Sequence, residues 1–152
     1  MAYNDLRKGR YSQTGGEYFI TTVVNGRRPL FADFQLARCF IHELAHSQLN
    51  GHCQWLAWVL MPDHFHGLLQ LQHNDLSNVI KKLKGRSARR INEYLYGAGD
   101  VGLQVGLKPD LQENGQRPSV WQANFYDHAL RTEENRVQIA RYIVANRSIK
   151  LT

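Results

Sequence analysis

Residues 53–71 read CQWLAWVLMPDHFHGLLQL, two apolar segments that flank the short turn Met61-Pro62-Asp63. Proline and aspartate favour a tight turn, and short apolar segments on either side of a turn are typical of strands. The sequence therefore predicts a hairpin of strands 53–60 and 64–71. Because residues 53–60 are apolar at successive positions, both faces of that strand should be covered, which predicts a central place in the sheet.

The segments around this hairpin alternate between strand and helix patterns. Residues 18–24 (YFITTVV) are aromatic and β-branched and end at Asn25-Gly26, which predicts a first strand. A helix should begin at the cap Asp33 and end at Asn50-Gly51, with these residues inward: Ala37, Phe40, Ile41, Leu44 and Ala45. A second helix is predicted from Asp75 to about Tyr96, with these residues inward: Leu76, Val79, Ile80, Leu83, Ser87, Ile91 and Leu95. A fourth strand is expected at 120–126, and a last helix from the cap Thr132 to about Asn146.

The predicted order of elements is βαββαβα, in a single domain over residues 1–152. An antiparallel sheet with helices on one face is a ferredoxin-like, or RRM-like, α+β arrangement, and the C-terminal helix follows this βαββαβ core. Residues 97–118 are rich in glycine and show no periodicity. A long flexible loop is expected there, of a length that is usually functional or disordered.

Composition favours a soluble protein that binds nucleic acid. Hydrophobic residues make up 43%, and 19 Lys and Arg against 13 Asp and Glu give a net charge of +6. A domain this basic often binds nucleic acid, although many basic proteins bind none. No apolar run is long enough for a membrane span, and the start of the chain does not resemble a secretory signal, which predicts a cytoplasmic location. Cys39 and Cys53 lie in apolar stretches and are interpreted as small core residues.

His64-Phe65-His66 is the most specific chemical feature. Alternate residues of a strand face the same way, so both imidazoles should project together while Phe65 enters the core. A bare pair of this kind is more often two polar side chains on an exposed sheet face. Here the pair follows a tight turn on a strand that should be central, in a basic domain, and two neutral imidazoles can chelate a cation. Asp63 is expected to point the other way.

Further ligands could come from the last helix, where Tyr142 and Asn146 are four residues apart and share a helical face. Val137, Ala140 and Val144 should form another face. An asparagine amide oxygen is a hard, neutral ligand that suits Mg²⁺ or Mn²⁺. The structural alternatives are a half-buried core aromatic for Tyr142 and a helix cap for Asn146.

The second helix should carry a basic stripe opposite its apolar face, formed by Lys82, Arg86, Arg89 and Arg90 with Lys81 and Lys84 at its margins. No acidic residue lies between Lys81 and Arg90, so the field of the stripe is expected to be unneutralised. The stripe is a candidate DNA-binding surface, and the alternative is an ordinary solvated helix face.

Three separated segments together resemble a known family. LAWVLMPDHFHGLLQL (56–71) is similar to the HUH signature of single-tyrosine transposases. LRKGRYSQTGGEYFITTV (6–23) and VWQANFYDHALRTEENRVQIARYIVAN (120–146) resemble, more narrowly, the REP-associated tyrosine transposases. The similarity covers nearly the whole chain.

This resemblance implies a ferredoxin-like fold and a metal-dependent enzyme that cleaves and rejoins single-stranded DNA containing palindromic REP hairpins. It implies that His64, His66 and Asn146 bind the metal and that Tyr142 is the nucleophile, which forms a 5′-phosphotyrosine. Lys8, Arg10 and Tyr11 are candidates for reading the tetranucleotide beside the hairpin. A monomer and a homodimer are both compatible with the sequence.

Two other functions remain open at this point. A non-enzymatic RRM-like module would explain the fold and the charge, but not the histidine pair or the spacing of Tyr142 and Asn146. A rolling-circle or relaxase-type HUH nuclease would share the histidine pair, but not the three segments.

Overall fold

The protein is described by a computed structural model, which places residues 13–97, 119–130 and 136–145. Four strands form one antiparallel sheet in the order β2-β3-β1-β4: β1 is Glu17–Val23, β2 Cys53–Leu60, β3 His64–Leu71 and β4 Tyr126–Ala129. The chain passes through α1 (Phe34–Leu49) between β1 and β2, and through α2 (Leu76–Tyr96) between β3 and β4. This order and these crossovers confirm the predicted ferredoxin-like arrangement.

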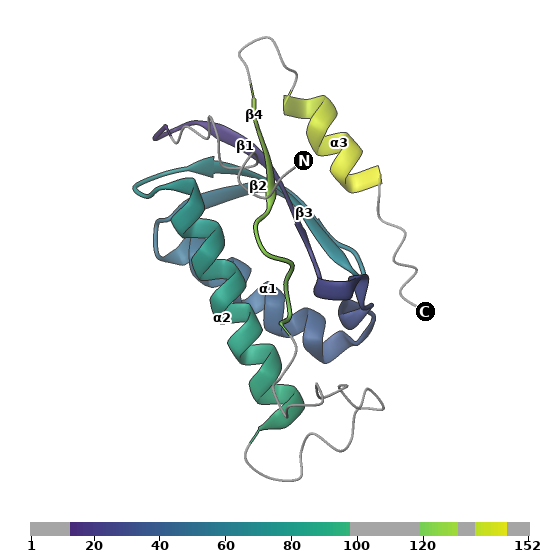
Figure 1. Ribbon diagram of the computed structural model, residues 1–152. Helices are drawn as coiled ribbons and strands as arrows, with labels where there is room; N and C mark the ends of the chain where they lie inside the picture. The colour runs from purple at the N-terminus through teal and green to yellow at the C-terminus, as the bar shows by residue number, and fades with distance from the viewer. Residues whose placement is uncertain (1–12, 98–118, 131–135, 146–152) are drawn as a thin grey trace.

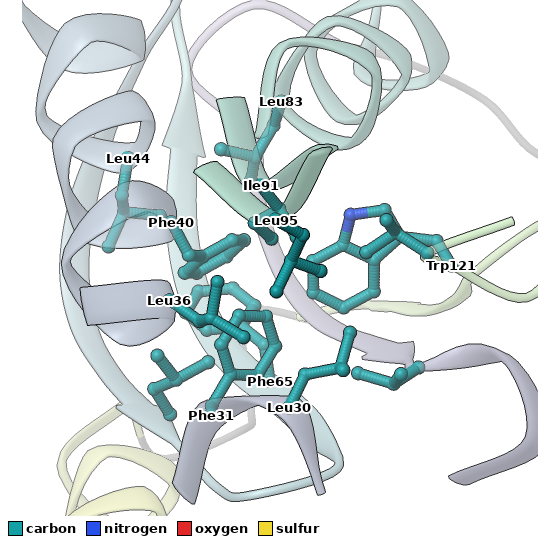
Figure 2. Packing of buried hydrophobic residues seen from close by; sticks show 13 residues of the cluster. Leu30, Phe31, Leu36, Phe40, Leu44, Phe65, Leu83, Ile91, Leu95 and Trp121 are labelled. Carbon is teal, nitrogen blue, oxygen red and sulfur yellow. The ribbon is translucent and has the colours of Figure 1, made fainter. Parts of the chain in front are cut away.

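α1 and α2 lie together on one face of the sheet (Figure 1). The core beneath them is aromatic at its centre, where Phe40 of α1 packs 4.9 Å from Phe65 of β3 and 5.4 Å from Trp121, measured between ring centroids. Figure 2 shows these rings between the two helices and the sheet. Gly67 has no side chain because a Cβ there would lie 2.5 Å from the Trp55 ring.

The two helices begin as predicted, but only one of them turns the predicted face inward. Asp33 caps α1 by accepting from the backbone N–H groups of Gln35 and Leu36. All seven predicted inward residues of α2 are buried. In α1 the buried positions are Leu36, Phe40, Glu43, Leu44 and Ser47, whereas Ile41 and Ala45 are exposed. The inner face includes polar residues whose partners lie on other elements. The spacing of apolar residues alone therefore predicted the wrong inner face for α1.

A third helix, α3 (Arg136–Ala145), lies on the opposite face of the sheet (Figure 1). Ile143 is its one fully buried residue among those described, and it packs against Val59 of β2 and Leu68 of β3. The prediction that strand 53–60 is central is wrong, because β2 is an edge strand. Both of its faces are apolar since α1 covers one and α3 covers the other.

The fourth strand is also displaced from its prediction. Residues 120–126 were expected to form it, but Val120, Trp121 and Phe125 instead enter the core from an irregular segment, and β4 begins only at Tyr126. The Trp121 indole N–H donates to Ser87 of α2, and Asn124 has a positive φ of 64°. Trp121 pairs through a single isolated bridge with Val24, just after β1, and the continuous strand begins only at Tyr126. The predicted loop lies outside the described residues from position 98 onward, as do the predicted cap Thr132 and Asn146.

Candidate active site

The two imidazoles of β3 lie side by side on the face of the sheet that carries α3. Their ring centroids are 4.7 Å apart with the planes at 77°, and Phe65 between them is fully buried on the other face. This confirms the predicted alternation. Leu68, two residues beyond His66, contacts Ile143 of α3, which fixes the shared face.

Each imidazole is held through its Nδ1 atom. His64 Nδ1 lies 2.6 Å from Asp63 Oδ1, and His66 Nδ1 lies 2.8 Å from Thr21 Oγ1 on β1. The prediction that Asp63 points away from His64 is wrong. Asp63 belongs to the turn rather than to the strand, so the alternation of strand side chains does not apply to it. Asp63 also accepts from Arg27 at 3.2 Å.

The electrostatics of these groups follow from their contacts. The hydrogen bond with His64 lowers the pKa of Asp63, with a smaller contribution from Arg27. Burial lowers the pKa of His66, and the neighbouring His64 lowers it further. The first effect favours a charged Asp63 carboxylate and the second a neutral His66 imidazole, the state in which an imidazole binds a metal.

The pair fits a metal site in this respect. Metal-binding histidines characteristically donate their second ring nitrogen to a carboxylate or another oxygen, as Asp63 and Thr21 allow here. Among the described residues neither Nε2 atom has a hydrogen-bond partner, so both remain for a ligand. No cluster of three or more His, Cys, Asp or Glu side chains is found in the described part of the chain. The predicted third ligand, Asn146, lies outside the described residues.

One aromatic ring, that of Phe19, connects the surroundings of Tyr142 on α3 with the histidine pair. Phe19 of β1 stacks on His66 at 5.4 Å between centroids, and Phe19 and Tyr142 line the same hollow of about 300 Å³. The Tyr142 side chain is 58% exposed, so it is not the half-buried core aromatic of the alternative reading. Ile139 and Ile143 form the inner face of α3, whereas the predicted Val137 and Val144 are largely exposed.

Three neighbours of the site were not predicted from the sequence: Thr21, Phe19 and His128. They lie on β1 and β4, and the strand register places Thr21 beside His66 and Phe19 beside His128. The alternation within YFITTV would assign Phe19 and Thr21 to one face. Their distance from the histidines, however, depends on pairing between strands far apart in the sequence.

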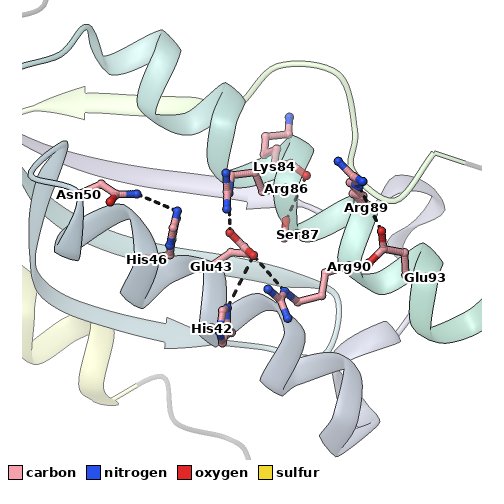
Figure 3. Close-up of polar contacts among 10 residues, drawn as sticks. All are labelled: His42, Glu43, His46, Asn50, Lys84, Arg86, Ser87, Arg89, Arg90 and Glu93. Atoms are coloured by element: carbon pink, nitrogen blue, oxygen red, sulfur yellow. Dashed lines mark hydrogen bonds and ion pairs between the residues drawn. The ribbon is translucent and has the colours of Figure 1, made fainter.

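The basic stripe of α2 is largely paired with acids, contrary to the expectation of an unneutralised field (Figure 3). Glu43 of α1, with a side chain only 3% exposed, accepts from Arg86 at 2.8 Å and from Arg90 at 3.0 Å. Arg89 pairs with Glu93 at 3.1 Å. The sequence between Lys81 and Arg90 does not indicate the pairing with Glu43, because Glu43 lies on another helix.

Lys84 is also withdrawn from the surface. Its ammonium group donates to the carbonyl oxygens of Gln122 and Asn124, and burial lowers the pKa of Lys84 to about 8. The helix that carries the stripe covers the sheet face opposite the histidine pair. A role of Lys82, Arg86, Arg89 and Arg90 in DNA binding stays a prediction. Lys8, Arg10 and Tyr11 lie outside the described residues.

Comparison with known sequences places this site in a family. Residues 12–100, more than half of the chain, match the sequence profile of the family described as IS200-like transposases. The chain belongs to the IS200-like transposase family. The match includes the histidine pair, Asp63 and Thr21, and it confirms the expected kinship with transposases.

The chain is also similar to a bacterial protein of undescribed function. An uncharacterized protein of Haemophilus influenzae is 27% identical over 92 residues, which are 59% of this chain and 51% of that protein. The match thus spans about half the length of this relative.

No helix in the described residues is long and apolar enough to cross a membrane.

Two solved structures share the fold. One is a REP-associated tyrosine transposase bound to a REP hairpin, with a TM-score of 0.64 and 23% identity, covering 90% of this chain and 69% of the other. A candidate transposase from Deinococcus radiodurans R1 has a TM-score of 0.56 and 24% identity, covering 91% and 95%. At these identities the likeness establishes the fold.

Proposed function

We propose that this member of the IS200-like family is a metal-dependent single-strand DNA endonuclease and strand transferase of the REP-associated type. It acts on REP-type hairpin DNA and forms a 5′-phosphotyrosine at Tyr142. One observation carries the proposal: two imidazoles with both Nδ1 atoms engaged share a sheet face with the helix that carries an exposed tyrosine.

His64 and His66 would hold a divalent cation, Mg²⁺ or Mn²⁺, through their Nε2 atoms, with Asn146 as the third protein ligand. When bound, the cation supplies a positive charge that polarises the scissile phosphate. Asp63 and Thr21 would orient the imidazoles by engaging their Nδ1 atoms, which leaves the Nε2 atoms for the cation. Phe19 separates His66 from the hollow beside Tyr142, which positions the phenol at the rim of the site.

Attack by the Tyr142 oxygen on phosphorus would leave a free 3′-hydroxyl on the other DNA end. One phosphodiester is exchanged for another of similar energy, so the reaction needs no nucleotide cofactor. Support for the substrate comes from the resemblance of segments 6–23 and 120–146 to REP-associated transposases, and from the net charge of +6. The solved relative bound to a REP hairpin shows the same fold.

The alternatives explain less of the site. A non-enzymatic RRM-like binder has no use for two imidazoles with engaged Nδ1 atoms, because it needs aromatic surfaces for stacking bases. A rolling-circle or relaxase-type nuclease is disfavoured by the match to the IS200-like family. Cytoplasmic location and the choice between monomer and homodimer stay predictions.

The test is a covalent adduct between the protein and a REP-type hairpin oligonucleotide in the presence of Mn²⁺ or Mg²⁺. With label on either side of the cleavage site, only the strand 3′ of the break should migrate with the protein on a denaturing gel. Chelation of the metal should abolish the adduct. A full yield of adduct in chelator would exclude metal-dependent cleavage.

Tyr142→Phe should bind the hairpin with unchanged affinity and form no adduct, because only the nucleophilic oxygen is lost. Tyr94→Phe, on α2 across the sheet, is the matched control and should react normally. Peptide mapping of the wild-type adduct checks the attachment point. If Tyr142→Phe still gave the adduct, the nucleophile would be elsewhere, with Tyr126 the next candidate.

A further inference from the structure

His128 shares the sheet face of the histidine pair, although nothing in the sequence around it indicates a site. It lies on β4 directly opposite Phe19 of β1, and Phe19 lies opposite Leu68 of β3. Side chains of directly opposed residues project to the same face of an antiparallel sheet. Because Leu68 contacts α3, the imidazole of His128 also lies on the α3 side.

The imidazole of His128 and the phenol of Tyr142 line one hollow. The hollow has a volume of about 300 Å³ and is formed by Phe19, His128, Gln138, Ile139 and Tyr142. Of these described lining residues, only His128 and Tyr142 carry a group that exchanges protons. Beside this part of α3, Arg136 of α3 forms an ion pair with Glu17 of β1, while Arg141 precedes Tyr142 on α3 and Asp127 precedes His128 on β4.

The proposed reaction leaves a proton to be accounted for. A tyrosine ordinarily titrates near pH ~10, so only about 0.1% is phenolate at neutral pH. A metal on His64 and His66 acts on the phosphate, and these imidazoles have both nitrogens committed once a metal is bound. A neutral imidazole beside the attacking phenol is the usual protein group for accepting such a proton.

We propose that His128 is the general base for Tyr142, an inference that rests on the proposed function. As the Tyr142 oxygen attacks phosphorus, its O–H bond breaks and the proton passes to an imidazole nitrogen of His128. The new O–P bond forms while the P–O3′ bond breaks, and the 3′ oxygen takes a proton from water. In the rejoining step a 3′-hydroxyl releases its proton to water as its oxygen attacks the phosphotyrosine, the tyrosine O–P bond breaks, and the departing tyrosine oxygen takes the proton back from His128.

The experiment measures the single-turnover rate of adduct formation as a function of pH, with a REP-type hairpin oligonucleotide and Mn²⁺. His128→Ala should slow the adduct by roughly 100-fold or more at neutral pH, the usual contribution of a general base. Its rate should keep rising with pH where the wild-type rate has levelled off, because hydroxide then removes the proton. Free imidazole should restore part of the rate to His128→Ala, since the hollow can accept it.

Controls separate this inference from the proposed function and from misfolding. His73→Ala removes an exposed imidazole in the turn after β3 and should match the wild type. Hairpin affinity and thermal unfolding of His128→Ala should be unchanged. Incorporation of a fluorinated, more acidic tyrosine at position 142 should reduce the effect of His128→Ala.

The outcomes are distinct. No adduct with the wild-type protein would overturn the proposed function itself. A wild-type adduct together with an unchanged rate in His128→Ala would overturn only the role of His128. A slow His128→Ala that keeps the wild-type pH profile and ignores imidazole would make His128 structural and overturn the inference as well.

Discussion

The orientation of the two imidazoles depends on two neighbouring residues, Asp63 and Thr21. Asp63 and Thr21 engage the Nδ1 atoms at 2.6 Å and 2.8 Å, which fixes the ring orientation. Without them each ring could rotate or bind through either nitrogen. Asp63 is in turn held by Arg27, so Thr21 on β1 and two residues in the connections, Asp63 and Arg27, support the pair on β3.

Asp63→Asn and Thr21→Val should each weaken binding of Mn²⁺ by about 10–100-fold, the usual cost of removing a hydrogen-bonding partner of a metal-binding histidine. His64→Ala and His66→Ala should lose binding almost entirely and abolish cleavage. The measurement is calorimetric titration of the protein with Mn²⁺ in the absence of DNA. His73→Ala serves as the control, and equal affinity for all variants would place the metal elsewhere.

At the scale of elements, the sequence predicted best what periodicity alone controls. α2 has its seven apolar or small residues at helical spacing, and all seven are buried. β3 has the predicted bounds, and for this reason the placement of His64 and His66 on one face of the sheet was predicted correctly. The inner face of α1, in contrast, includes Glu43 and Ser47, which are buried only because α2 and Trp55 supply partners. β4 was misplaced because residues 120–125 meet the sheet only through the single bridge between Trp121 and Val24, while the side chains of Trp121 and Phe125 fill the core. The neighbours Thr21, Phe19 and His128 could not be predicted without the strand register.

Glu43 fastens α1 to α2, and its effect on stability should depend on pH. Burial raises the pKa of Glu43, but the hydrogen bonds and charges of Arg86 and Arg90 outweigh it and keep the pKa below its usual value. A depressed pKa means that this stabilisation is present above the unfolded value of about 4.3 and is lost as pH falls through the folded value.

Glu43→Gln should therefore lower the free energy of unfolding by about 1–3 kcal/mol at neutral pH, since both arginines are partly exposed and can be hydrated. The difference from the wild type should shrink as the pH is lowered below about 4. Urea titrations at several pH values measure it, with Glu93→Gln, which has an exposed side chain, as the control. If the difference in the free energy of unfolding stayed constant with pH, the ionised Glu43 carboxylate would not be the source of the stabilisation.

At the scale of the whole molecule, the basic surface and the histidine pair lie on opposite faces of one sheet. Glu43 neutralises part of the α2 stripe, and Lys84 is turned inward. Lys82 and Arg89 are the exposed cations of the stripe best able to meet phosphates, because Arg89 has only a surface partner. A bound strand that reached both the stripe and the histidines would have to pass around an edge of the sheet.

Lys82→Ala/Arg89→Ala tests whether DNA takes this path. The double variant should bind hairpin DNA more weakly, and the plot of log affinity against log salt should flatten by about 0.7 for each lost contact to a single strand. Discrimination between a REP hairpin and a scrambled one should survive, because phosphate contacts position without specifying. Arg38→Ala, on α1, is the control. An unchanged slope would mean that the stripe is an ordinary solvated helix face that does not contact DNA.

α3 is joined to the rest of the molecule by very little buried surface. Among its described residues Ile143 alone is fully buried, whereas α2 buries seven. Segments with few buried apolar contacts open without global unfolding, and their backbone amides exchange with deuterium sooner. Amides of α3 should therefore exchange well before those of α1 and α2, and Ile143→Ala should speed them further while leaving the other helices protected. Val144→Ala, at a largely exposed position, should leave the exchange of α3 unchanged. The segment that carries Tyr142, the proposed nucleophile, would then be the described helix that detaches most easily from the sheet.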